Sequence, residues 1–284
     1  MQAALAAIFR YPVKSMGGHT MPDTLLTENG MPGDRCWTVK DEERGGIKGG
    51  KRFPELMSMS AELLAEPDDT TPSPPVQITL PDGATVQADD ANINDKLSGA
   101  VNSPVSLWPL LPKDQLDHYL REPMPEGVDP EAALREVFAR TPDEPLPDMS
   151  TFPPEIFTYE SPPGTYFDAF PLLIMSTSAL QSMAEVNDSN FDVRRFRPNL
   201  LVETDQPGFP ENDWVGRTVR LGGATLKVEM QCPRCIMTTH GFNDLPKDPK
   251  VMRALVQANN GDLGVYASVL TPGKVSVGDK LIID

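Results

Sequence analysis

Alternating apolar and polar residues dominate this 284-residue chain, and this pattern is typical of strands. The clearest pair covers residues 214–221 and 224–230 on either side of Gly222-Gly223, a dipeptide that suits a tight hairpin turn. Other strands are expected at 3–10, 36–40, 76–80, 84–88, 172–175, 263–270 and 274–283. Helices are expected at 92–101, 131–139, 177–186 and after Asp248-Pro249. This count predicts a β-dominated α+β fold, closer to a closed barrel than to a doubly wound sheet.

Residues 112–163 differ in composition from the rest of the chain. The segment holds 11 of the 30 prolines and carries 12 acidic against 4 basic residues. One helix is expected inside it, at 131–139, because Asp129 can cap the helix and a proline follows at its first position. The rest has the composition of a linker or an excursion. The chain therefore divides into three regions: 1–111, an acidic proline-rich insert at 112–163, and 164–284.

Charge and cysteine content argue against several classes of protein. The net charge is −16, from 41 acidic and 25 basic residues, which disfavours nucleic-acid binding and a polybasic contact with membranes. No apolar run approaches the roughly 20 residues of a membrane span, and the start lacks the basic region of a signal peptide. Three cysteines are not typical of a disulfide framework. We expect a cytoplasmic globular protein with no nucleic-acid partner and no membrane span.

A run of arginines is the first candidate for a binding site. Arg194, Arg195 and Arg197 occupy three of four successive positions. Such a run is usually a solvated face. Here a proline fixes the backbone after Arg197 and Asn199 can hydrogen-bond a ligand, so we favour an anion-binding role. A phosphate would draw in further cations and hydroxyls, because it takes several charge-assisted hydrogen bonds. The other candidates are Lys14, Ser15 and Arg35.

The pair Cys232-x-x-Cys235 is the second candidate, and alone it is a weak signal. It could be half of a zinc site, although no second pair exists and the chain has only 3 histidines. It could also be a thioredoxin-like pair, or two buried thiols packed as small hydrophobes. The remaining interpretation is one functional cysteine beside Arg234, whose charge favours the thiolate that attacks or binds a metal.

Four short motifs, in this order, resemble the MOSC family. They are Tyr11-Pro12-Val13-Lys14-Ser15, Gly33-Asp34-Arg35, Phe196-Arg197-Pro198-Asn199 and Cys232-x-Arg234-Cys235-x-x-Thr238-Thr239. The pattern is most similar to the mitochondrial amidoxime-reducing component and its bacterial relatives. The resemblance covers residues 1–110 and 164–284, and leaves the insert at 112–163 unmatched. It implies an N-terminal β-barrel-like domain (1–111) packed on a MOSC β-barrel (164–284) with short helices.

The resemblance also implies a cofactor and a set of site residues. The family binds the pterin molybdenum cofactor (Mo-molybdopterin), not pyridoxal phosphate. The second cysteine, Cys235, would ligate the metal, and Asp168 would be a second catalytic residue near it. The remaining cofactor contacts would be Lys14, Ser15, Arg35, Arg197, Asn199 and Arg234. A soft thiolate for molybdenum and arginines for a phosphate agree with the chemistry of these residue types.

The activity implied by the resemblance is two-electron reduction of small N-hydroxylated substrates, such as amidoximes and hydroxylaminopurines. Some bacterial relatives carry a C-terminal iron–sulfur domain, but this sequence has no cysteine after Cys235 with which to hold a cluster. An external electron-transfer protein is therefore expected as a partner. The alternative is a non-catalytic protein that carries the cofactor or sulfur to other proteins.

Overall fold

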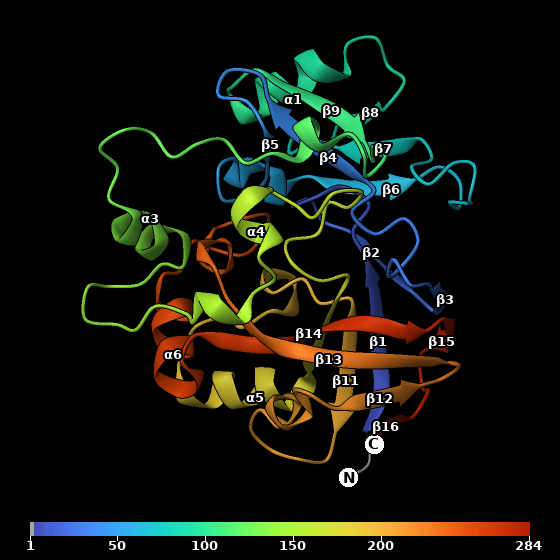
Figure 1. The fold of residues 1–284 in the computed structure, drawn as a ribbon, viewed down its shortest axis with the longest axis vertical. Coiled ribbons are helices and arrows are strands. Elements are labelled where there is room, and N and C mark those ends of the chain that lie inside the picture. Colours follow the sequence, from blue (N-terminus) through green and yellow to red (C-terminus); the bar gives the residue numbers. More distant parts are fainter. Residues whose placement is uncertain (1–2) are drawn as a thin grey trace.

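The largest element of the computed structural model, which describes residues 3–284, is a curled eight-stranded sheet (Figure 1). Its strands are β1 (Ala3–Arg10), β2 (His19–Met21), β10 (Leu172–Ser176), β11 (Leu200–Thr204), β12 (Thr218–Leu221), β13 (Ala224–Pro233), β14 (Asp262–Thr271) and β16 (Leu281–Ile283). Their spatial order is β16-β12-β13-β14-β10-β11-β1-β2. The Leu5 N–H donates to the Asp279 carbonyl, and the Gly278 N–H to the Leu5 carbonyl, each at 2.8 Å. These bonds bring β1 close to the far edge, so the sheet curls into a half-barrel.

The alternating pattern of β13 follows from its position in this sheet. Every second residue from Ala224 to Cys232 is buried, and the residues between them are partly exposed. Ala224, Leu226 and Val228 pack with Trp214 and Val265 inside the barrel, where removal of apolar surface from water stabilises the fold. The hairpin from β12 to β13 turns at Gly222, with φ of +53°, as the sequence predicts. The expected strand at 214–221 is shorter than predicted, because Trp214 ends a 3₁₀ helix.

The N-terminal barrel domain has a separate core. Its elements are β4 (Trp37–Asp41), β5 (Ile47–Lys48), β6 (Ser60–Leu63), β7 (Val76–Thr79), β8 (Thr85–Gln87), β9 (Val105–Pro109) and the helix α1 (Ile93–Val101). The strands form two sheets, β5-β4-β9 and β6-β7-β8, which enclose Leu56, Ile78 and Leu97. A ribbon of β3 (Asp23–Leu26) and β15 (Gly273–Ser276) ties the N-terminal segment to the C-terminal one. The predicted class, β-dominated with two barrel-like domains, is confirmed.

Helices are few and mostly short. The helices α5 (Thr177–Val186) and α6 (Lys250–Asn259) cover one face of the large sheet and bury Met183 and Leu255 there (Figure 1). Ser176 caps α5 by accepting a hydrogen bond from the Ala179 N–H at 3.0 Å. The others are α2 (Leu116–Tyr119), α3 (Pro130–Val137), α4 (Glu155–Thr158), η1 (Pro54–Ser58), η2 (Met149–Thr151), η3 (Val193–Arg195), η4 (Pro210–Trp214) and η5 (Ile236–Thr239). Within residues 3–284, no helix combines the length and apolar character needed to cross a membrane.

The insert at 112–163 packs against both domains. The buried guanidinium of Arg140 donates to the Asn260 carbonyl at 3.3 Å, which attaches the insert to the large sheet beside α6. Arg140 lies in the middle of the insert, and near its start Tyr119 packs on Tyr166 in a small buried cluster beside the N-terminal domain. The insert projects as loops and short helices along one side of the molecule (Figure 1). It is an excursion with fixed ends.

Arg195 has a structural role, and its replacement gives a first prediction. The side chain is 1% exposed and its guanidinium donates to the carbonyls of Asn190, His240 and Pro246 at 2.7–2.9 Å. Arg195→Ala would leave these carbonyls without their charged donor, so we expect a loss of about 3 kcal/mol or more. Urea unfolding would measure it. The control, Arg194→Ala, removes two exposed ion pairs, with Asp192 and Asp244, and should cost about 1 kcal/mol or less. Equal stability of the two variants would contradict this role.

Candidate functional site

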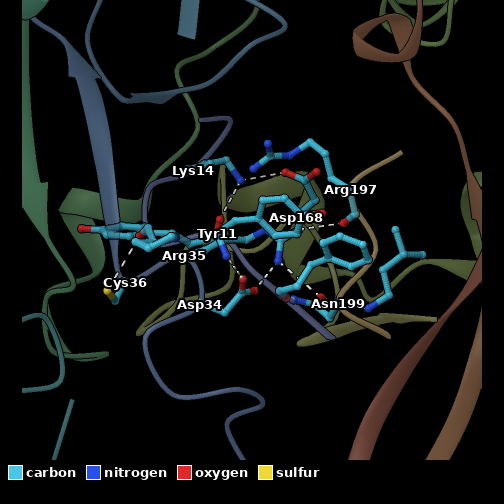
Figure 2. A network of polar contacts seen from close by, with 12 residues as sticks. Tyr11, Lys14, Asp34, Arg35, Cys36, Asp168, Arg197 and Asn199 are labelled. Atoms are coloured by element: carbon cyan, nitrogen blue, oxygen red, sulfur yellow. Dashed lines mark hydrogen bonds and ion pairs between the residues drawn. The ribbon is translucent and has the colours of Figure 1, made fainter. Parts of the chain in front are cut away.

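Two guanidinium groups meet at the buried ring of Tyr11, directly after β1. The Cζ atom of Arg197 lies 4.3 Å from the ring centroid, and that of Arg35 lies 5.3 Å from it. Figure 2 shows both arginines with Lys14 and Asp168 gathered around this ring. These residues converge because β1 pairs with β11, which begins just after Arg197 in the sequence. The structure therefore brings together the three cations expected for an anion site.

Backbone strain is concentrated at the same place. Ser15, Arg35 and Arg197 have φ values of 70°, 49° and 56°, in the left-handed region that non-glycine residues rarely adopt. They are three of the seven non-glycine residues with positive φ among residues 3–284. Each such conformation costs about 1–3 kcal/mol and persists only where the surroundings enforce it, commonly at functional sites. The strained backbone sets where these three side chains point.

Lys14 and Asp168 form an ion pair at the centre of the cluster. The Lys14 Nζ donates to Asp168 Oδ1 at 2.7 Å and to the Tyr166 carbonyl at 2.8 Å. Loss of hydration alone would raise the pKa of Asp168, but Lys14, the nearby Lys51 and Arg35 together hold that pKa well below its ordinary value. The Asp168 side chain is 56% exposed, so this carboxylate faces the open side of the cluster. It is ionised at neutral pH.

Arg197 carries an unsatisfied donor. Its Nη1 donates to the Met16 carbonyl at 2.6 Å, while its buried Nη2 has no hydrogen-bond partner. Burial, followed by repulsion from Arg35, lowers the pKa of Arg197 to about 10. Arg35 itself is paired with the carboxylate of Asp34. Burying a guanidinium charge beside a second one costs free energy, and one of its N–H donors has no partner. Both features suit the binding of an anion beside Arg197.

Asn199 supports the cluster from below in Figure 2. Its side chain is 1% exposed, its Oδ1 accepts from the Leu173 N–H at 3.2 Å and the Arg35 Nη1 at 3.4 Å, and its Nδ2 donates to the Phe9 carbonyl at 3.4 Å. The carboxamide is thus engaged by the protein on both sides. It positions Arg35 and joins β1 to β10.

The arginine run does not act as one group. Arg194 is on the surface and pairs with the carboxylates of Asp192 and Asp244. Arg195 is buried under backbone carbonyls, as described above. Only Arg197 enters the cluster around Tyr11. The hypothesis that a ligand neutralises the whole run is therefore wrong, because protein carboxylates and carbonyls satisfy the first two arginines.

The two cysteines lie in different surroundings. Cys232, the last buried residue of β13, is 2% exposed, and burial raises the pKa of its thiol. The Arg234 Nη1 donates to the Cys232 Sγ at 3.1 Å, and its Nη2 to the Phe196 carbonyl at 2.5 Å. Arg234 therefore contacts Cys232 directly and links the cysteine loop to the segment that carries Arg197. Cys235 is only half-buried, at the start of η5.

A turn at Gly49 and Gly50 also borders the site. The Gly50 N–H donates to the Ser15 Oγ at 2.8 Å, so Ser15 orients this turn. A Cβ at Gly49 would lie 2.5 Å from the Ser15 Oγ, and one at Gly50 would lie 2.7 Å from Met237, which follows Cys235 by two residues. The turn therefore lies between the Lys14 segment and the cysteine loop, and two glycines allow that close approach.

Lys51, the residue after this turn, is the functional candidate that sequence reasoning missed. Lys51 is an exposed residue, and loss of hydration alone would lower the pKa of its ammonium, but Cys235 and then Asp168 raise that pKa above its ordinary value. Lys51 is thus close enough to interact electrostatically with both groups. Its signal in the sequence was a lysine directly after Gly49-Gly50, within a charged stretch that has the character of an ordinary loop.

The site suits an anionic ligand that also binds one cysteine sulfur. The buried Nη2 of Arg197 and Nε of Arg234 have no hydrogen-bond partner. Lys51 adds positive charge near the half-buried Cys235, and Lys14 adds it beside Asp168. Among residues 3–284 there is no group of three or more His, Cys, Asp or Glu side chains that could hold a metal ion. Unsatisfied cationic donors and a single accessible thiol match a pterin phosphate and a soft metal that the cofactor brings with it.

Comparisons with known proteins match this chain to two family models. The model described as MOSC N-terminal beta barrel domain matches residues 2–110, and the model described as MOSC domain matches residues 163–282. The mitochondrial amidoxime-reducing component 1 of Mus musculus is 24% identical over 306 aligned positions, which cover 98% of this chain and 82% of that protein.

Two further relatives match less of their own length. The mitochondrial amidoxime reducing component 2 of Homo sapiens is 32% identical over 127 positions, covering 40% of this chain and 37% of that protein. The molybdenum cofactor sulfurase of Drosophila grimshawi is 23% identical over 269 positions, covering 92% of this chain but 31% of that protein. These relatives include proteins named for a reductase and for a cofactor-modifying enzyme.

Proposed function

Because the chain belongs to the MOSC domain family, with its N-terminal β-barrel domain, we propose that it binds the molybdenum cofactor and reduces small N-hydroxylated substrates. The observation that carries this proposal is the convergence of Lys14, Arg35 and Arg197 around Tyr11 and Asp168, with Lys51 close enough to interact with both Asp168 and the half-buried Cys235. The relatives named as amidoxime-reducing components support the choice of substrate class.

Each residue of the site has a distinct role in this proposal. The Cys235 thiolate is the metal ligand. Lys14, Arg35 and Arg197 hold the pterin phosphate, Arg197 through its unpartnered Nη2. Ser15 and Asn199 act indirectly, because their side chains are bound to Gly50 and Arg35. Arg234 fixes the cysteine loop against Phe196. When bound, the cofactor supplies the two-electron redox chemistry.

Asp168 orients the substrate in this proposal. Reduction of an N-hydroxyl group to an amine and water consumes two electrons and two protons. Because its pKa is held well below the ordinary value, Asp168 is a poor proton donor at neutral pH. It is instead an acceptor, and its exposed carboxylate suits the N–H groups of an amidoxime. The ammonium groups of Lys14 and Lys51, and water, are the available proton donors.

The alternative function is a carrier of the cofactor or of sulfur to other proteins. It is favoured by the similarity to molybdenum cofactor sulfurase over 92% of this chain. The carrier would use the same cations and the same cysteine. It differs in one respect, since it would hold the cofactor without reducing an N-hydroxylated substrate.

The test of the proposal is metal content together with turnover. We expect molybdenum to co-purify in a ratio approaching one per chain from a host that makes the cofactor. The protein should reduce benzamidoxime to benzamidine with reduced methyl viologen as donor. Protein from a host that cannot make the cofactor is the control and should do neither. Bound molybdenum without reduction would favour the carrier, and zinc bound through Cys232 and Cys235 would refute both functions.

The electron donor is proposed to be a separate protein. The expected result is that reduced nicotinamide alone, without a protein or dye donor, supports no turnover by the purified holoprotein. Full turnover with reduced nicotinamide alone would contradict the need for a partner.

A further inference from the structure

Large apolar side chains are exposed on one part of the insert. Leu116 is the first residue of α2, and Leu120 directly follows its last residue, Tyr119. The N–H of residue 121 donates to the carbonyl of residue 158 at 2.9 Å, which brings α4 and Phe157 next to Leu120. Met124 follows. We call this surface the insert face, and the exposed fractions are Leu116 45%, Leu120 42%, Met124 52% and Phe157 58%.

Acidic side chains flank the insert face. Asp117, Glu122 and Glu155 are exposed and lie within two residues of its apolar members in the sequence. The insert as a whole carries 12 acidic and 4 basic residues, a net charge of −8 in a chain of net charge −16. The basic residues nearby in the sequence are Lys113 and Arg121, and Arg121 is paired with Glu160. An apolar patch flanked mainly by acidic side chains is typical of a surface that recognises a basic partner.

The insert face leads directly to the candidate site. Four residues after Phe157, the buried Ser161 lies with its Oγ 3.4 Å from the Lys14 Nζ. The preceding residue, Glu160, accepts from the Lys48 Nζ at 2.6 Å and pairs with Arg121 at 2.9 Å. These contacts fix the insert beside the residues that would surround the cofactor. A protein bound to the insert face would therefore stand close to the reacting centre.

We propose that the insert face is the docking site of the electron donor, a redox protein with lysines and arginines around an apolar contact patch. This inference rests on the proposed function, which requires an external source of two electrons. Charge disfavours the other occupants, because a second copy of this chain also carries −16 and an anionic membrane would repel the acidic surface. Opposite charges speed encounter and orient the partner, while the apolar centre provides contact area.

The probe for this surface is cytochrome c, a small basic haem protein. Its affinity for the holoprotein would be measured by calorimetry at low ionic strength. In a second measurement, the holoprotein would be reduced with the dye, freed of excess dye and mixed with oxidised cytochrome c. One two-electron centre would then reduce two molecules of cytochrome c, because each haem accepts one electron. The insert variant is Asp117→Lys, Glu122→Lys and Glu155→Lys together. The matched control is Asp69→Lys, Asp89→Lys and Asp188→Lys, which changes the net charge equally.

The expected result is that the insert variant binds cytochrome c about 10-fold or more weakly than wild type and transfers electrons correspondingly slowly, while the control stays within about 3-fold. Phe157→Ser should weaken binding without changing charge. Equal losses in both triple variants, or no binding by wild type, would overturn the proposal, as would self-association of wild type through this face.

Turnover of benzamidoxime with methyl viologen separates this inference from the proposed function. The small dye needs no docking surface, so both triple variants should match wild type in that assay. Absence of dye-driven turnover in wild type would refute the reductase function. The calorimetric comparison would still show whether the insert face binds a basic redox protein. Dye-driven turnover combined with unaltered cytochrome c binding in the insert variant would refute only the docking proposal.

Discussion

Cys235→Ser is expected to abolish both molybdenum binding and N-hydroxy reduction. The substitution replaces a soft sulfur with a hydroxyl that stays protonated at neutral pH, so the metal would lose the protein ligand that we propose for it. Cys235 is half-buried and its backbone starts η5, where serine is accommodated without strain. The fold should therefore persist, with a melting temperature within a few degrees of wild type. Molybdenum content by mass spectrometry and dye-driven turnover, measured on the same preparation, check the prediction.

Cys232→Ser is the matched control, three residues away. Cys232 is buried at the end of β13 and receives a hydrogen bond from Arg234. A serine hydroxyl can accept the same bond, so the expected cost is about 1–3 kcal/mol of stability, from placing a more polar group in the core. Molybdenum content and turnover should stay near the wild-type level. If the Cys232 variant is the inactive one and the Cys235 variant survives, the assignment of the metal ligand is wrong.

Local features of the sequence were enough to predict much of the fold. The alternation in 224–230 marks β13, and the glycine pair before it supplies the hairpin turn. Helix caps were equally local: Ser176 receives the Ala179 N–H, and Asp129 receives the N–H of the first turn of α3. Such signals depend on the chemistry of a few neighbouring residues. They therefore survive in the folded protein wherever packing does not override them.

The site depended on contacts that no local pattern contains. The three arginines of the run lie in three different environments. The helix η3 turns Arg194 to the surface and Arg195 into the core, and Arg197, with a left-handed backbone conformation, enters the site. The role of Lys51 requires the turn at Gly50 to pass beside Met237, far away in the sequence. The motifs identified the cations that converge, but long-range packing decides which of their atoms remain free.

Arg197→Ala is expected to reduce cofactor occupancy by roughly 10- to 100-fold at limiting cofactor. The variant loses charge-assisted hydrogen bonds to the phosphate, each worth about 1.5–3 kcal/mol. It also loses the cation–π contact with Tyr11 and the bond from Nη1 to the Met16 carbonyl. Because removing the guanidinium also relieves its repulsion with Arg35, the protein itself should lose little stability. Molybdenum content and thermal unfolding, measured together, distinguish lost binding from lost structure.

Two other variants make this result specific to the position of the charge. Arg194→Ala removes the same charge from the surface, where Asp192 and Asp244 are its partners, and should leave occupancy unchanged. Arg197→Lys keeps the charge but replaces the planar fork by a single ammonium, so an intermediate occupancy is expected. If Arg194→Ala lowers occupancy as much as Arg197→Ala does, the effect is one of net charge, and the unpartnered Nη2 of Arg197 is not the phosphate contact.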